Sequence, residues 1–141
     1  MCADNGVVSE GVSQSDSRVT AQVAKEIAAG RSSVNMLANQ FSTEILTVDI
    51  GIDSDIYCSN IINKKIAYGT RSIAKGPAMD PSQARKAISN GIEIVYDLCR
   101  NGTDIIITGE MGIGNTTTSA AIASVILGIP AEITTGRGAG L

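Results

Sequence analysis

Hydrophobic residues recur at helical spacing in three stretches of the chain. The first stretch covers 18–29, and the second covers 33–41 and ends at Phe41, the only phenylalanine. The third covers 80–101, with an apolar stripe that reaches Cys99. Spacings of three and four residues predict amphipathic helices that each bury one side. Phe41 and Cys99 are therefore expected in the core, and the long third helix is expected to cover a sheet.

Short apolar runs predict the strands of that sheet. A brief run precedes Asp4 at the start of the chain, a second occupies 44–52, and a third occupies 105–108. The third run has three consecutive isoleucines, which predicts a strand buried on both faces. Strands alternating with helices indicate an α/β fold with a parallel sheet flanked by helices. The first strand is so short that residues upstream of it are expected.

The length of 141 residues predicts a single α/β domain over 1–141. Within it, 53–79 is polar and weakly patterned and contains the adjacent pair Lys64 and Lys65. This segment exceeds ordinary loop lengths, so it is expected to be functional or to form a small lobe with short helices. The two lysines are expected on an exposed helix or loop.

A glycine turn follows the 105–108 run and carries the main chemical signal of the sequence. Gly112 and Gly114 lack a Cβ, so a ligand can approach their amides closely. Asn115 and Thr116 are suited to cap the following helix, whose first N–H groups have no partner inside the helix. This pattern predicts a phosphate site built from backbone amides. The helix itself, 118–127, is apolar nearly all round, which predicts burial between layers or at a subunit interface.

Two charged residues flank this turn. Glu110 precedes it and is expected near ribose hydroxyls or a developing cation, because a carboxylate repels phosphate. Arg137 lies between Gly136 and Gly138, which predicts a second loop that faces an anion. In the alternative reading the glycines only form a tight turn, Glu110 is a solvated loop residue and Arg137 belongs to a flexible tail. The turn matches neither the P-loop nor the dinucleotide fingerprint, because Asn115 and Thr117 stand where those motifs need lysine and a small residue.

Composition excludes several other classes of protein. The net charge is −3 and the pI is about 4.8, which argues against a nucleic-acid surface. There is no histidine, and the three cysteines are far apart, so neither a zinc site nor a disulfide framework is expected. No apolar run is long enough to span a membrane and no leader pattern follows Met1. A cytoplasmic location is expected.

Residues 109–117 resemble the signature of the nicotinate-nucleotide:dimethylbenzimidazole phosphoribosyltransferase family, which acts in cobalamin assembly. The matching letters are Gly-Glu-Met-Gly-Ile-Gly-Asn-Thr-Thr. Further blocks resemble the family in the same order, at 3–7, 10–13, 48–51, 76–79 and 136–138. The resemblance covers essentially the whole chain.

This resemblance implies a doubly wound, Rossmann-like α/β domain with a small helical domain. It also implies a homodimer that transfers the 5-phosphoribosyl group of nicotinate mononucleotide to 5,6-dimethylbenzimidazole. The products are α-ribazole 5′-phosphate and nicotinate, with inversion at the anomeric carbon, and neither a metal nor an organic cofactor is implied. The implied substrate-binding residues are Ser13, Gln22, Glu110, Met111, Gly112, Ile113, Gly114, Asn115, Thr116, Arg137 and Gly138. Among them, the Gly112 to Thr116 amides are expected to hold the phosphate. Ser13, Gln22 and Met111 are expected along the benzimidazole pocket.

The family enzyme is longer than this chain, so the chain resembles a fragment truncated at both ends. The glutamate regarded as the general base lies in the C-terminal portion of the family, beyond position 141. We therefore expect an incomplete catalytic site. Two alternatives stay open from the residues alone: a non-catalytic module that binds a nucleotide or ribose phosphate, and a partner subunit whose 118–127 helix forms a dimer contact.

Overall fold

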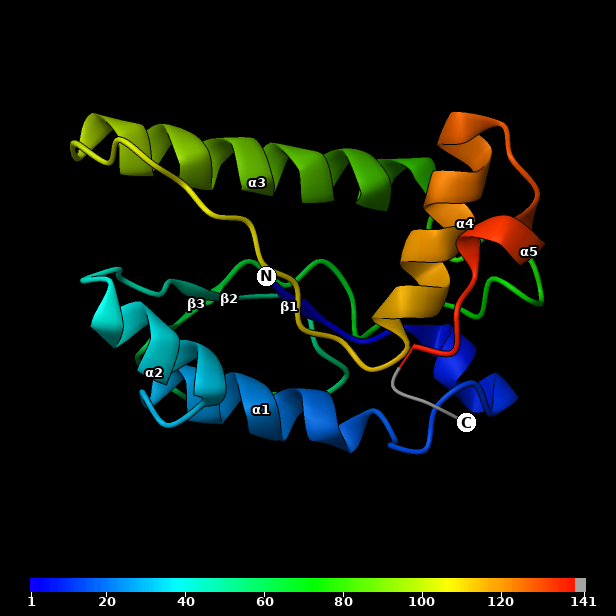
Figure 1. The fold of residues 1–141 in the computed structure, drawn as a ribbon, viewed down its shortest axis with the longest axis horizontal. Helices are drawn as coiled ribbons and strands as arrows, with labels where there is room; N and C mark the ends of the chain where they lie inside the picture. The colour runs from blue at the N-terminus through cyan, green and yellow to red at the C-terminus, as the bar shows by residue number, and fades with distance from the viewer. Residues whose placement is uncertain (139–141) are drawn as a thin grey trace.

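A computed structural model describes residues 1–138 and shows a parallel three-stranded sheet flanked by helices (Figure 1). The strands lie in the order β1–β2–β3, and Cys2 pairs with Asp49 while Thr47 pairs with Ile61. The elements are β1 (Cys2–Ala3), the 3-10 helix η1 (Gly6–Glu10), α1 (Arg18–Ala28), α2 (Ser33–Gln40), β2 (Thr47–Gly51), β3 (Ile61–Asn63), α3 (Pro81–Arg100), α4 (Asn115–Leu127) and α5 (Ala131–Thr134). The predicted α/β class is confirmed.

The core lies between α1 and the sheet. Cys2, Ala24, Ile52 and Ile61 form its buried cluster, and Met111 packs against it. Helix α1 contacts all three strands, whereas α3 lies on the other side of the sheet (Figure 1). The amphipathic pattern of α1 is therefore satisfied by burial against the strands.

The carboxyl end of β2 is fixed by a buried ion pair. Asp49 accepts hydrogen bonds from the backbone N–H groups of Gly51 and Ile52, and its Oδ2 lies 2.9 Å from Lys65 Nζ. Only 12% of the Lys65 side chain is exposed, so the expectation of an exposed lysine pair is wrong for Lys65. The lysine is drawn inward because it neutralises a buried carboxylate.

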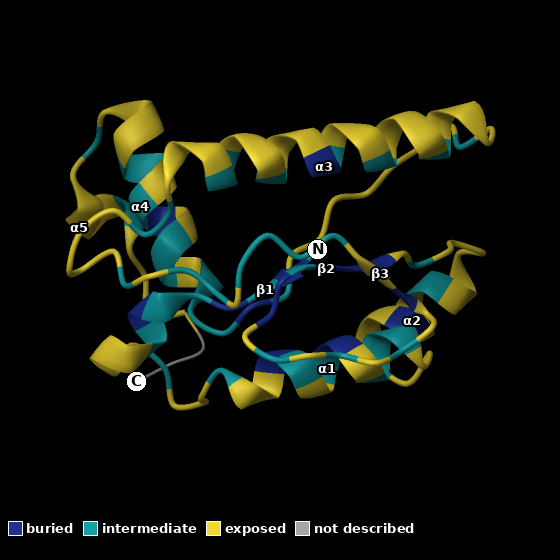
Figure 2. Cartoon of the chain, turned by 180° about the vertical axis from the view of Figure 1, so that it is seen from behind, coloured by how far each residue is buried: buried dark blue, intermediate teal, exposed yellow. Residues whose placement is uncertain are grey.

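Helix α3 begins as the sequence predicts and then differs from prediction. The Asp80 N–H donates to Gln83 Oε1 at 2.8 Å in a capping box at its start. However, Asn90 is its only buried residue, and Cys99 is exposed. Its side toward the sheet is only half-buried, and its outer apolar residues meet no layer among the described residues (Figure 2). The expected full burial of the α3 stripe, including Cys99, is therefore wrong for this chain.

The isoleucine run at 105–108 is another correction. This segment is extended but forms no strand, and the exposed fractions of Ile105 and Ile107 are 80% and 78%. Farther along, Met111 forms a parallel bridge with Cys2, and Met1 N donates to Gly109 O at 3.0 Å. Contact with β1 is therefore observed only from 109 onward. Apolar composition predicted a buried strand at 105–108, but pairing and burial both needed neighbours that the described residues do not supply.

Three smaller expectations also change. Residues 53–79 contain β3 and no helix, so a helical lobe is not observed there. Phe41 is 75% exposed, because it is the C-cap of α2 and lies past that helix's packed side. Helix α4 starts at Asn115 and only its Ala120 is buried, so the sheet layers do not enclose it. A dimer contact on α4 stays a prediction.

In the described part of the chain, no helix is both long and apolar enough to cross a membrane.

Candidate phosphate-binding site

The glycine turn lies directly against the end of β1. Ala3 N donates to Met111 O at 3.1 Å, which lays residue 111 alongside the strand. A Cβ placed on Gly112 would lie 2.2 Å from Ala3 O and 2.9 Å from Asn5 Nδ2. Any other residue at this position would push the turn off the strand, so the close approach requires glycine.

Gly114 then turns the chain into α4. It is the N-cap of α4 and has a φ of 80°, in the left-handed region that favours glycine. Within the turn, Ile113 N–H donates to Thr20 Oγ1 at 3.2 Å and Asn115 N–H donates to Gly112 O at 3.1 Å. The expectation that every amide from Gly112 to Thr116 holds the phosphate is therefore wrong for these two. Among the described residues, the N–H groups of Gly112, Gly114 and Thr116 have no partner.

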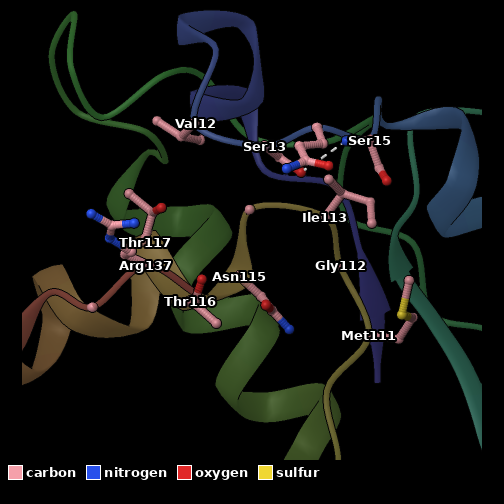
Figure 3. A pocket seen from close by; sticks show the side chains of 13 residues that line it. Val12, Ser13, Ser15, Met111, Gly112, Ile113, Asn115, Thr116, Thr117 and Arg137 are labelled. Carbon is pink, nitrogen blue, oxygen red and sulfur yellow. Dashed lines mark hydrogen bonds between the residues drawn. The ribbon is translucent and has the colours of Figure 1, made fainter. Parts of the chain in front are cut away.

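Gly112, Gly114 and Thr116, whose N–H groups are free, line a cavity of about 220 Å³ at the N-terminus of α4 (Figure 3). The turn supplies one wall, the loop after η1 supplies another, and the loop after α5 supplies the third. The lining residues are Val12, Ser13, Gln14, Ser15, Met111, Gly112, Ile113, Gly114, Asn115, Thr116, Thr117, Gly136 and Arg137. Free backbone donors at the positive end of a helix favour an anion in this space.

Arg137 adds the positive side chain to the site. Arg137 is exposed and takes part in no ion pair within residues 1–138. A Cβ placed on Gly138, whose φ is 57°, would lie 2.6 Å from Thr116 Oγ1. The loop after α5 thus packs closely on the first turn of α4, and Arg137 lines the same cavity as Gly112, Gly114 and Thr116.

Three expected site residues lie outside the cavity lining. Gln22 is exposed on α1, and Gly138 lies close to the Thr116 side chain but is not among the lining residues. Glu110 accepts a hydrogen bond from Asn115 Nδ2. The surrounding protein displaces water from Glu110 and raises the pKa of its carboxyl, while the Asn115 amide opposes that rise. In this geometry Glu110 orients Asn115 rather than reaching the cavity itself.

Sequence reasoning missed several contributors to the site. Val12, Gln14 and Ser15 extend the wall that Ser13 was expected to form, and their place in the same polar loop was the available signal. The sequence did not indicate that Thr20 and Asn5 bond the turn, because they are 93 and 108 positions away from Ile113. No cluster of three or more histidine, cysteine or acidic residues in the described ranges is arranged to hold a metal ion.

Comparison with known proteins identifies the family. The sequence model of the family described as "Phosphoribosyltransferase" (DBI_PRT) matches residues 1–141. The chain is 50% identical over 141 residues to the nicotinate-nucleotide–dimethylbenzimidazole phosphoribosyltransferase of Ruminiclostridium cellulolyticum, and 46% identical to that of Clostridium acetobutylicum. All of this chain is covered in both comparisons, but it spans only 40% of the length of each relative.

The fold agrees with solved structures. The crystal structure of CobT from Thermus thermophilus matches 99% of this chain with a TM-score of 0.95 and 35% identity, over 42% of its own length. A second structure, of the phosphoribosyltransferase from the same organism, matches 91% of the chain with a TM-score of 0.87. The chain therefore belongs to the nicotinate-nucleotide–dimethylbenzimidazole phosphoribosyltransferase family.

Proposed function

We propose that this chain supplies the phosphate-binding part of an enzyme that transfers a 5-phosphoribosyl group from nicotinate mononucleotide to 5,6-dimethylbenzimidazole. The products are nicotinate and α-ribazole 5′-phosphate, the precursor of the lower ligand of cobalamin. The single observation that carries this proposal is that Gly112, Gly114 and Thr116, whose N–H groups are free, line the same cavity as Arg137.

The chemistry divides into binding and bond exchange. The 5′-phosphate accepts hydrogen bonds from the free amides, each contributing about 1.5–3 kcal/mol to a charged acceptor. Arg137 offers two further N–H donors to the same anion. With the phosphate fixed, the bond between the anomeric carbon and the nicotinate nitrogen breaks while a benzimidazole nitrogen bonds to the opposite face of that carbon. The nicotinate leaves with the electron pair of the broken bond.

The azole must also lose its N–H proton, and this needs a base near neutral pKa. No aspartate or glutamate belongs to the described lining of the cavity. Glu110 hydrogen-bonds Asn115 and lies outside that lining. We infer that the base comes from outside the described residues, so that this chain binds the nucleotide but does not complete the transfer.

Calorimetric titration of the 141-residue chain tests the binding step. Nicotinate mononucleotide should bind about 100-fold or more tightly than nicotinate riboside, because the riboside lacks the phosphate and its hydrogen bonds. Gly114→Ala should remove most of this difference, because a Cβ at this position with a φ of 80° would lie 2.9 Å from Val8 Cγ2. Gly91→Ala is the matched control, since a Cβ there meets nothing within 4 Å. Equal affinity for both ligands in the wild-type chain would refute the phosphate site.

Release of nicotinate tests the catalytic step. With both substrates present, the chain should release nicotinate at a rate that dimethylbenzimidazole does not increase. Turnover that depends on dimethylbenzimidazole would instead place a working base within this chain. A protein of family length that binds the nucleotide but never shows that dependence would favour the non-catalytic binding module.

A further inference from the structure

The peptide groups on both sides of Ile113 are each held by a side chain from a distant segment. Ile113 N–H donates to Thr20 Oγ1 at 3.2 Å, and Ile113 O accepts from Asn5 Nδ2 at 3.1 Å. Thr20 lies on α1 and is fully buried, whereas Asn5 follows β1. We propose, on the basis of the phosphate site proposed above, that Thr20 and Asn5 are positioning residues. They fix the orientation of the peptide groups whose amides bind the phosphate.

The geometry of the peptide bond connects Asn5 to the anion. No peptide bond among the described residues is cis, so the C=O of Ile113 and the N–H of Gly114 point in opposite directions across one plane. Asn5 Nδ2 holds that C=O on its own side. The Gly114 N–H is therefore directed away from Asn5. It has no partner among the described residues, and Gly114 lines the cavity.

Thr20 acts on the preceding peptide in the same way. Its hydroxyl oxygen accepts a hydrogen bond from Ile113 N–H. The C=O of Gly112, in the same peptide group, therefore points to the opposite side, where it accepts a hydrogen bond from Asn115 N–H at 3.1 Å. That bond closes the turn which starts α4. The hydroxyl of Thr20 therefore bonds the Ile113 amide and fixes the orientation of its peptide group, while the amides of Gly112 and Gly114 stay free.

The orientation of the Asn5 amide is itself determined. Asn5 Oδ1 lies 3.2 Å from Thr118 Oγ1 in the first turn of α4, and the single proton of that hydroxyl is shared between Asn5 Oδ1 and Asn115 O. The opposite orientation of the amide would place two oxygens, those of Asn5 and Ile113, against each other. Asn5 thus connects β1, the turn and α4, and Thr20 connects the turn to α1.

The test measures the phosphate ratio, defined as the dissociation constant of nicotinate riboside divided by that of nicotinate mononucleotide. Thr20→Val keeps the shape of the side chain but leaves Ile113 N–H without an acceptor, so the ratio should fall about tenfold. Thr20→Ser keeps the hydroxyl and should retain the wild-type ratio. Asn5→Ala should also lower the ratio about tenfold. Thr43→Val, at an exposed threonine after α2, is the control and should leave the ratio unchanged.

A purely structural role gives a different result. It would weaken both ligands equally or lower stability alone, leaving the ratio at the wild-type value in Thr20→Val and Asn5→Ala. Circular dichroism identifies variants that fail to fold. If Thr20→Val fails to fold, Asn5→Ala decides, because Asn5 is only half-buried. Failure of the phosphate site itself is distinct, since the wild-type ratio would then be near one.

Amide NMR provides an independent measurement. Titration of the ¹⁵N-labelled chain with inorganic phosphate should shift the Gly114 amide proton strongly in the wild-type and Thr20→Ser proteins. The same shift should be much smaller in folded Thr20→Val and Asn5→Ala. An unchanged Gly114 shift in these two variants would overturn the positioning role.

Discussion

Helices α1 and α3 carry similar amphipathic patterns but differ in what covers them. Helix α1 contacts all three strands and buries Thr20 and Ala24. Helix α3 buries only Asn90, which donates to Lys64 O at 3.0 Å. An amphipathic pattern therefore predicts that one side of a helix prefers burial, but it does not say which residues supply the cover.

The accessible surface of the whole chain is larger than that of a compact monomer of the same mass. Its accessible surface is 9429 Å². A compact monomer of 14.5 kDa would expose about 6,900 Å². Much of the excess is apolar surface on α3, α4 and the 105–107 run, whereas the face of α1 toward the sheet holds buried residues (Figure 2). Three matched pairs of variants compare the α1 side with α3.

The largest expected difference in stability is between variants of two adjacent lysines. Lys65 pairs with Asp49 in the sheet, with side-chain exposures of 12% and 4%, whereas Lys64 pairs with Glu93 of α3, at 28% and 57%. Lys65→Met leaves the Asp49 charge buried and unpaired, so it should lower the free energy of unfolding by about 3–5 kcal/mol. Lys64→Met should cost less than about 1 kcal/mol. Urea unfolding followed by circular dichroism measures both, and equal midpoints would contradict the comparison.

A matched isoleucine pair tests packing without charge. Ile52 is fully buried beneath α1, and Ile92 on α3 is 53% exposed. Ile52→Ala should cost about 2–5 kcal/mol because it leaves a cavity. Ile92→Ala should change stability by less than about 0.5 kcal/mol. A comparable loss in both variants would mean that α3 is covered in solution, for example by a second copy, and sedimentation would then show the dimer.

The smallest expected effect concerns two thiols. Burial raises the pKa of Cys2 from its ordinary value of 9.0, while Cys99 is exposed. The folded form therefore resists losing the Cys2 proton, and stability present below pH 9.0 should decline as the pH rises through the raised pKa. Cys2→Ala should flatten this decline in urea unfolding, and Cys99→Ala should not. A thiol reagent at pH 8 should modify Cys99 well before Cys2, and the reverse order would contradict the assignment.

Local patterns predicted the parts of the structure that depend on nearby residues. The helix bounds of α1 and α3, strand β2 and the glycine turn all follow from spacing and capping within a short window. The 105–108 run failed as a strand because burial depends on neighbours, not on its own letters.

The chemical details of the site were less predictable. The glycines indicated an amide-built anion site, but the partners of those amides come from segments far away in the sequence. Thr20 is an ordinary helix residue in the sequence, and its bond to Ile113 exists only because α1 packs beside the turn. Only the tertiary structure could therefore show which amides stay free.

The exposed isoleucines at 105–107 also affect how the chain behaves at high concentration. They form a β-branched, uncharged segment without strand pairing, and Ile105 and Ile107 are largely exposed to water. Such segments pair readily with copies of themselves and seed cross-β aggregates. Amyloid-dye fluorescence should therefore develop in concentrated solutions of the wild-type chain, and a charged substitution such as Ile107→Lys should delay it.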